Sequence, residues 1–232
     1  MTDTSAAAAA LAQHDADVAA RWRELESGKL VRVIGIVNER ARPIKQRHHK
    51  RVNAVLNNPA MTISAKIEAL WEAVDEIGKT AAPHAACRRG CSHCCHTSVL
   101  MPAQEAALIG KRIGVKPAKV TGVTQRGDIE SGYHNPCPFL KDGACSIYAS
   151  RPLACRQQFN MDTDALLCEL VGAPSKVPYL NMFDYQTALA MITATQRECI
   201  ERDPRTGRPV PVTIRTAPDV GDIREFFPRG RS

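Results

Sequence analysis

Apolar residues recur at helical spacing in two segments within residues 1–80. Val18, Trp22 and Leu25 follow one another at steps of four and three, and their segment stops near Gly28. A second series, with the same alternation of steps, lies between positions 63 and 77 and ends before a glycine. Such steps place side chains on one face of an α-helix. Two amphipathic helices are therefore predicted.

The segments beside these helices carry weaker signals. The apolar stretch Leu30–Val37 is too short for its period to distinguish helix from strand, and we favour a helix. Thr62 or Ser64 can cap the second helix, because a side-chain hydroxyl accepts a hydrogen bond from an early backbone N–H. Trp22 and Trp71 share helix faces with other apolar residues, so we assign both to the core.

The pattern changes after position 80, where short elements alternate with polar turns. Pro102–Ile113 has one apolar face and is followed by Gly114, which predicts a helix that ends there. Asp142 and Gly143 form a turn signal between two short apolar runs, and this predicts a small hairpin. Asn181–Glu201 has helical spacing, and its first residue is a suitable cap.

These patterns predict a mainly α fold, in which helices surround a loop-rich, metal-stapled cysteine module with a short β-hairpin. The length of 232 residues suits one core of ordinary size with appendages. We divide the chain into a helical N-terminal region (1–80), a cysteine-cluster metal-binding module (81–176), a C-terminal helix packing on the core (177–202) and an extended Pro/Arg-rich tail (203–232).

Composition adds one unusual feature, which is nine cysteines in a chain with ordinary proportions of hydrophobic (44%) and charged (24%) residues. No apolar run approaches the roughly 18 residues that a membrane span needs. The Ala-rich N-terminus lacks the basic start of a secretory signal, so we expect a cytoplasmic protein. In a reducing compartment, an odd number of thiols favours metal binding over a disulfide framework.

The first cysteine cluster reads Cys87-Arg-Arg-Gly-Cys91-Ser-His-Cys94-Cys95. The two-residue gap between Cys91 and Cys94 lets a tight turn aim both sulfurs at one metal. Cys87, four positions earlier, can reach the same metal through one turn of chain. The side chains of Cys94 and Cys95 diverge because the residues are adjacent. One of these two is expected to serve a second metal or a different atom of a cluster.

A second cluster follows about forty residues later. Cys137 and Cys145 are expected near the open ends of the small hairpin, so that both sulfurs can meet one metal. Cys155 follows a Ser-Arg-Pro sequence typical of a helix start, where the helix dipole favours a thiolate. Arg151 and Arg156 can offset the negative charge that four thiolates leave on a dication.

The run CxxxCxxCC, followed by CPFL…G.CSIY..RP..CR, resembles the YkgJ-type cysteine-cluster proteins, which are described as zinc- or iron-chelating domains. The resemblance covers roughly Cys87 to Cys168. Members commonly show CxxCxxCC, whereas three residues separate Cys87 from Cys91 here. The resemblance implies a metal-binding module and makes Cys168 the eighth ligand.

The expected metal ligands are Cys87, Cys91, Cys94, Cys95, Cys137, Cys145, Cys155 and Cys168. They can form two four-thiolate sites, or one four-thiolate cluster and a second site with partial ligation. Sulfur ligation suits both zinc and iron–sulfur clusters. We favour iron–sulfur, because closely spaced cysteine runs are typical of polynuclear clusters. His93 and His96 are expected beside the metal rather than on it, and Cys199 is interpreted as a buried apolar residue of the final helix.

Two functions remain open at this point. In the first, a metal centre carries electrons or binds a substrate, in a redox or enzymatic accessory role. In the second, zinc only staples the fold, and the basic run Arg40–Arg51 binds a macromolecule. That run has no interleaved aromatic residues, so we interpret it as a solvated helix face and do not expect nucleic acid as a partner, although the net charge of +7 is compatible with one. No nucleotide-binding or acyl-transfer motif is present, and catalysis is left open.

Overall fold

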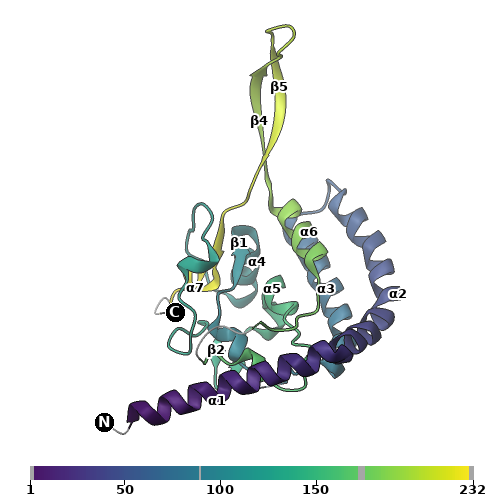
Figure 1. The fold of residues 1–232 in the computed structure, drawn as a ribbon. Helices are drawn as coiled ribbons and strands as arrows, with labels where there is room; N and C mark the ends of the chain where they lie inside the picture. Colours follow the sequence, from purple (N-terminus) through teal and green to yellow (C-terminus); the bar gives the residue numbers. More distant parts are fainter. Residues whose placement is uncertain (1–2, 89, 172–175, 230–232) are drawn as a thin grey trace.

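The computed structural model describes residues 3–88, 90–171 and 176–229 (Figure 1). Helix α1 (Asp3–Glu24) leads through the turn Leu25–Lys29 into helix α2 (Leu30–Leu56), which confirms a helix over the ambiguous apolar stretch. The chain bends between the two helices at Gly28, whose φ is 104°. Glycine adopts this backbone conformation readily because it has no Cβ.

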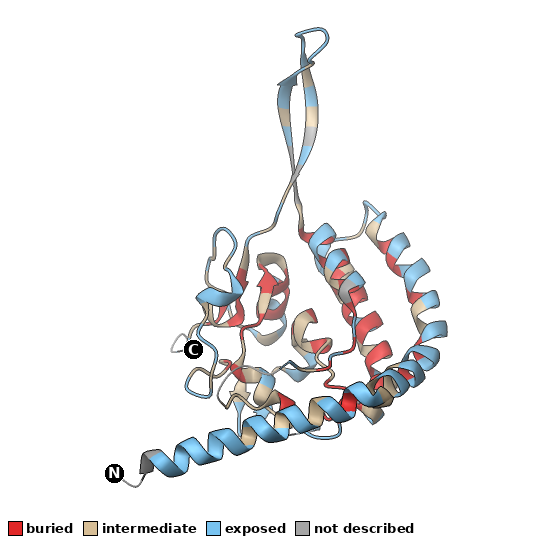
Figure 2. Cartoon of the chain, viewed as in Figure 1, coloured by how far each residue is buried: buried red, intermediate tan, exposed pale blue. Residues whose placement is uncertain are grey.

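Helix α3 (Ile63–Ala81) forms the centre of the core and packs against α2. Its N-terminus is capped as expected, since the Thr62 hydroxyl accepts a hydrogen bond of 3.2 Å from the Ala65 N–H. Figure 2 shows buried residues along most of its length. They include the apolar series Ile67, Leu70, Val74 and Ile77, together with Trp71. Each fully buried side chain of this size stabilises the fold by about 1.5–3 kcal/mol.

Helix α4 (Ala103–Ile113) ends at Gly114, which has a left-handed φ of 73°, as the sequence predicts. It follows strand β1 (Leu100–Pro102), which pairs with strand β6 (Val220–Asp222) in antiparallel register. Helix α7 (Ile223–Phe226) then returns to the core. The expectation of an extended tail over 203–232 is therefore wrong for residues 220–227. Isolated apolar residues near the C-terminus gave no periodic signal, yet they fill the core.

The helix expected over Asn181–Glu201 is correct only in its first half. Helix α6 spans Phe183–Thr193, and Met182 rather than Asn181 is at its N-cap position. Strand β4 (Thr195–Arg202) follows and pairs with strand β5 (Pro209–Thr216), so that Cys199 lies half-buried on a strand instead of a helix. Figure 1 shows this hairpin projecting away from the helices. Its pairing partner lies in the segment that the sequence indicated as a tail, which is why local spacing missed it.

The cysteine-rich region is built from short elements. Strands β2 (Leu140–Lys141) and β3 (Ala144–Cys145) form the predicted hairpin, and helix α5 (Leu153–Arg156) carries Cys155. The fold class is confirmed, with 54% helix and small two-stranded sheets. None of the helices in the described parts of the chain combines the length and the apolar character that a bilayer span requires.

Candidate metal centre

The first cysteine cluster is shaped by successive tight turns. The Cys91 N–H donates to the Arg88 carbonyl at 3.0 Å, and the Cys95 N–H donates to the Ser92 carbonyl at 2.8 Å. Cys94 and Cys95 both lie on the short 3-10 helix His93–His96. This chain of turns brings the sulfurs of the run close in space.

The second cluster is tied to the first through the backbone. The Cys137 N–H donates to the Cys95 carbonyl at 2.7 Å. Asp142 and Gly143 both have positive φ, at 49° and 72°, which is the conformation of the two-residue turns that close hairpins. The turn brings Cys145 back beside Leu140, three positions after Cys137. The predicted hairpin thus brings Cys145 back toward Cys137, the first cysteine of this cluster.

The eight cysteines fall into two neighbourhoods. Burial is the largest cause of the raised pKa of Cys168, and three nearby thiols, Cys87, Cys91 and Cys94, raise it further. Burial also raises the pKa of Cys155, and the thiols near it are Cys94, Cys137 and Cys145. The Cys95 pKa is raised by its hydrogen bond with Cys94 and by burial, with smaller effects from two other thiols, Cys137 and Cys155.

We call one neighbourhood the first sulfur set, consisting of Cys87, Cys91, Cys94 and Cys168. The second sulfur set consists of Cys95, Cys137, Cys145 and Cys155. Cys94 borders both sets, and we group it with the first because its neighbour Cys95 is tied to Cys137. The structure thus brings all eight expected ligands into one region, and Cys199 lies apart from them on β4.

The thiols are gathered but not closed around a common point. All nine cysteines, each within the described residues, are free of disulfides. In the same described residues, no group of three or more Cys, His, Asp or Glu side chains is arranged to hold a metal ion as it stands. The donor chemistry nevertheless fits zinc or iron, since each set offers four thiols. Ligation is coupled to folding, so the side chains must turn toward an ion as it binds.

The environment keeps most of these thiols protonated. Burial raises the pKa of Cys137 to about 11 and that of Cys168 to about 12. Cys94 is different, because the hydrogen bond from the Cys95 thiol lowers the Cys94 pKa to about 7. A metal ion would therefore displace protons from the buried thiols and bind more tightly as the pH rises.

The two arginines expected to offset thiolate charge both pair with Asp75 of α3. Burial raises the pKa of Cys145, and the nearby positive charge of Arg151 opposes that shift. The Arg156 guanidinium also lies 4.4 Å over the Trp71 ring. Nothing in the sequence around Cys155 indicated this second role, because Asp75 and Trp71 come from α3.

Glu105 belongs to this region, although no motif in the sequence indicates it. Its side chain is fully buried, and its Oε1 accepts hydrogen bonds from Trp71 Nε1 at 2.7 Å and from the Leu153 N–H at 2.8 Å. The second bond fixes the first residue of α5, the helix that carries Cys155. Burial raises the pKa of Glu105 to about 7. A glutamate in the first turn of a helix normally indicates a solvent-facing position.

The histidines of the first cluster both contact Tyr133. His93 Nδ1 lies 2.7 Å from the Tyr133 hydroxyl, and the His96 ring centroid lies 4.9 Å from that of Tyr133. These contacts are compatible with the expected place of both histidines beside a metal. The role of either residue toward a metal stays a prediction.

Part of the basic run on α2 is paired with acidic residues of α3. Arg47 and the buried His48 both contact Glu76, and Arg51 Nη2 donates to Glu72 Oε2 at 2.6 Å. These pairs agree with the interpretation of the run as an ordinary helix face, and they leave less free positive charge for a macromolecular partner.

A folded region with eight clustered free thiols is typical of thiol-rich, metal-chelating modules. Residues 86–199 match the family model CxxCxxCC, described as a "putative zinc- or iron-chelating domain". The match covers the cysteine-rich region of the chain, which confirms the resemblance. No match was found among curated proteins or among solved structures.

Proposed function

We propose that this protein binds zinc or iron at two centres, one held by each sulfur set. The observation that carries the proposal is the grouping of eight free thiols into two neighbourhoods that meet at Cys94 and Cys95. The thiols of Cys94 and Cys95 are hydrogen-bonded to each other where the two neighbourhoods meet, so this pair is suited to deliver one sulfur to each of two adjoining centres. Four thiolates at each centre complete a tetrahedral ligand set for zinc or an iron–sulfur cluster.

The proposal favours iron–sulfur centres in a redox or accessory role. Dense cysteine runs are typical of such clusters, and hydrogen bonds to sulfur adjust their reduction potentials. A cluster of this kind supplies electron transfer when it is bound. This chain would contribute the ligands, the partial burial of the sulfurs and the nearby positive charge of Arg151. Purely structural zinc is the competing outcome.

Metal analysis and an anaerobic absorption spectrum test this proposal on the full chain. We expect iron and acid-labile sulfide, with broad visible absorption that bleaches on reduction by dithionite. A colourless protein with two equivalents of zinc would retain the two centres and overturn the redox role. A folded protein that takes up neither zinc nor iron after anaerobic reconstitution would contradict the proposal as a whole.

A further inference from the structure

One buried asparagine contacts two sulfurs of the first sulfur set. The Asn160 backbone N–H donates to Cys87 Sγ at 3.5 Å, and its Nδ2 donates to Cys168 Sγ at 3.2 Å. These cysteines are far apart in sequence, at opposite ends of the module. Asn160 is 1% exposed, so water does not compete for these bonds. The residue therefore sets where the two sulfurs stand relative to each other.

The side-chain amide of Asn160 has only one orientation that satisfies its surroundings. Its Oδ1 accepts from the Asp162 N–H at 3.1 Å, and its Nδ2 also donates to the Asp164 carbonyl at 3.2 Å. If the amide were flipped, its NH2 group would face the Asp162 N–H and its oxygen would face the Asp164 carbonyl, and neither contact could be a hydrogen bond. The loop that holds Asp162 and Asp164 thus points the amide nitrogen at Cys168.

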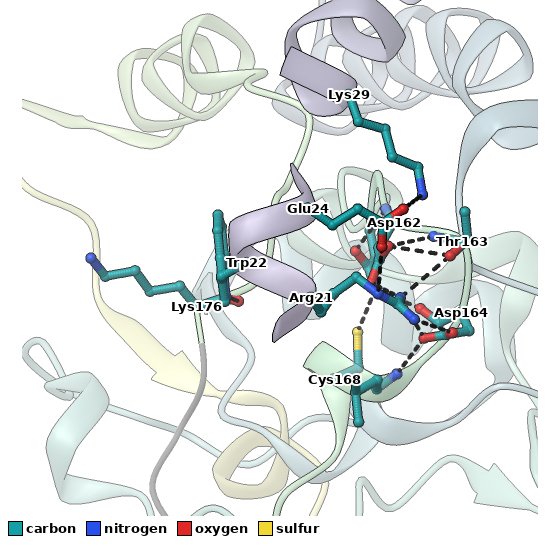
Figure 3. A network of polar contacts seen from close by, with 11 residues as sticks. Arg21, Trp22, Glu24, Lys29, Asp162, Thr163, Asp164, Cys168 and Lys176 are labelled. Atoms are coloured by element: carbon teal, nitrogen blue, oxygen red, sulfur yellow. Dashed lines mark hydrogen bonds and ion pairs between the residues drawn. The ribbon is translucent and has the colours of Figure 1, made fainter. Parts of the chain in front are cut away.

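Arg21 of helix α1 holds that loop in place, as Figure 3 shows. Its Nη1 donates to Asp162 Oδ2 at 2.6 Å, and its Nη2 donates to Asp164 Oδ2 at 2.8 Å. The Asp162 side chain is fully buried, so this charge depends on its partner. A chain of direct contacts then runs from α1 through the loop and Asn160 to the sulfurs of Cys87 and Cys168.

The second sulfur set has an equivalent contact from the other end of the chain. Arg224 of helix α7 donates from Nη2 to the Cys95 carbonyl at 3.3 Å and to the Asn135 carbonyl at 2.9 Å. Its Nη1 also donates to the Thr97 carbonyl at 3.1 Å. These bonds hold the backbone beside Cys95 and Cys137. Both Arg21 and Arg224 lie outside the matched segment 86–199.

We propose that Arg21 and Arg224 are positioning residues, each for one metal centre, and that Asn160 transmits the effect of Arg21 to the sulfurs. This proposal rests on the two centres proposed above. Helices α1 and α7, both outside the matched segment, therefore act on the centres through these contacts. Each one fixes the backbone that presents one sulfur set, and the two centres can be loosened separately.

The test measures metal release from each centre of the full-length protein. The protein is freed of metal and reloaded with Co²⁺, whose thiolate absorption reports sulfur ligation, and release to EDTA is followed by stopped flow. Cys168→Ser and Cys145→Ser assign the release phases to the first and second centres. Arg21→Gln should accelerate only the first phase, and Arg224→Gln only the second, by about tenfold or more. Arg23→Gln, an exposed arginine on the same helix as Arg21, is the matched control and should change neither phase.

Two outcomes would overturn the positioning roles. One is that either variant accelerates both phases equally, which is the effect of general destabilisation. The other is that neither variant changes its phase. Where a glutamine variant does not fold, Arg21→Lys and Arg224→Lys replace it, because lysine keeps the charge and loses the forked geometry. Asn160→Asp, which removes the side-chain donor to Cys168, should reproduce the selectivity of Arg21→Gln.

A metal-free measurement separates this proposal from the proposed function. Dibromobimane, a short thiol cross-linker, should join Cys87 to Cys168 in the wild type and do so less efficiently in Arg21→Gln, with the Cys137–Cys145 product unchanged. If the wild type takes up no Co²⁺ but shows this selectivity, the metal centres are wrong and the positioning role of Arg21 stands. Equal cross-linking in both proteins would refute that role.

Discussion

The two sulfur sets differ in what surrounds them. Cys137 of the second set is part of the apolar core, and Cys95 and Cys155 pack against it. In the first set only Cys87 packs against the core, and its contacts with Cys168 run through the polar side chain and backbone of Asn160. Hydrophobic burial therefore stabilises the second set in addition to the hydrogen bonds of Arg224, whereas the first set depends mainly on an ion-pair and hydrogen-bond network. This difference predicts that losing the second centre lowers the free energy of unfolding more than losing the first.

Cys155→Ser should have the largest effect, because it removes a ligand that packs against the core. We expect loss of the second centre and a fall in the free energy of unfolding of about 4 kcal/mol, or roughly 8–16 °C in Tm. Metal content and thermal melting measure both effects. Cys199→Ser is the control, since this cysteine lies on the projecting hairpin, and it should keep full metal. Full metal content and unchanged melting in Cys155→Ser would show that Cys155 is not a metal ligand.

Glu105→Gln tests the buried carboxyl behind the second set. Burial raises the pKa of Glu105 from 4.5 to about 7, so between these pH values the folded state holds a proton that the unfolded state has lost. Stability must then fall as the pH rises from about 4.5 to 7, by about 1–3 kcal/mol. Glutamine keeps the acceptor for Trp71 and Leu153 and does not titrate. Melting curves of metal-loaded protein should show a flatter pH dependence in the variant, and equal slopes would show that Glu105 does not titrate in this range.

Cys168→Ser should remove the first centre at a smaller cost to stability. We expect a fall of about 1–2 kcal/mol in the free energy of unfolding, or roughly 2–8 °C in Tm, because the core remains packed. Metal content should fall by one centre. If this variant melted below Cys155→Ser, the comparison between the two sets would be reversed.

Arg51→Gln should have the smallest effect and serves as a reference outside both sets. Its ion pair with Glu72 is solvent-exposed, and such pairs contribute less than about 1 kcal/mol. Metal content should be unchanged, and Tm should move by no more than about 4 °C. A loss of metal here would mean that the helix pair α2 and α3 supports the centres more directly than the contacts indicate.

Local signals in the sequence predicted much of the fold. Thr62 capped the expected helix, Gly114 ended another, and Asp142-Gly143 closed the hairpin beside Cys145. Each of these signals acts through residues a few positions away. Cysteine spacing likewise identified the segment that the family model matches, while the assignment of each sulfur to a centre stays a prediction.

Features that depend on distant partners were not predictable in this way. Local spacing indicates a helix where strand β4 lies, because its pairing partner β5 is separated from it by a turn and has no period of its own. Arg21 contacts Asp162 across 141 positions, and Arg224 contacts Cys95 across 129. An arginine on a helix surface looks the same in sequence whether it faces water or a buried carboxylate. Only the packing of the chain ends against the module distinguishes the two.

Native mass spectrometry of the anaerobically reconstituted protein tests the division into two centres most directly. We predict that the wild type carries the mass of two centres, and that Cys87→Ser/Cys168→Ser and Cys137→Ser/Cys145→Ser each carry one. The surviving centre in each variant should retain its own absorption spectrum. A wild type with a single centre, or the loss of all metal from both double variants, would contradict two separate sulfur sets.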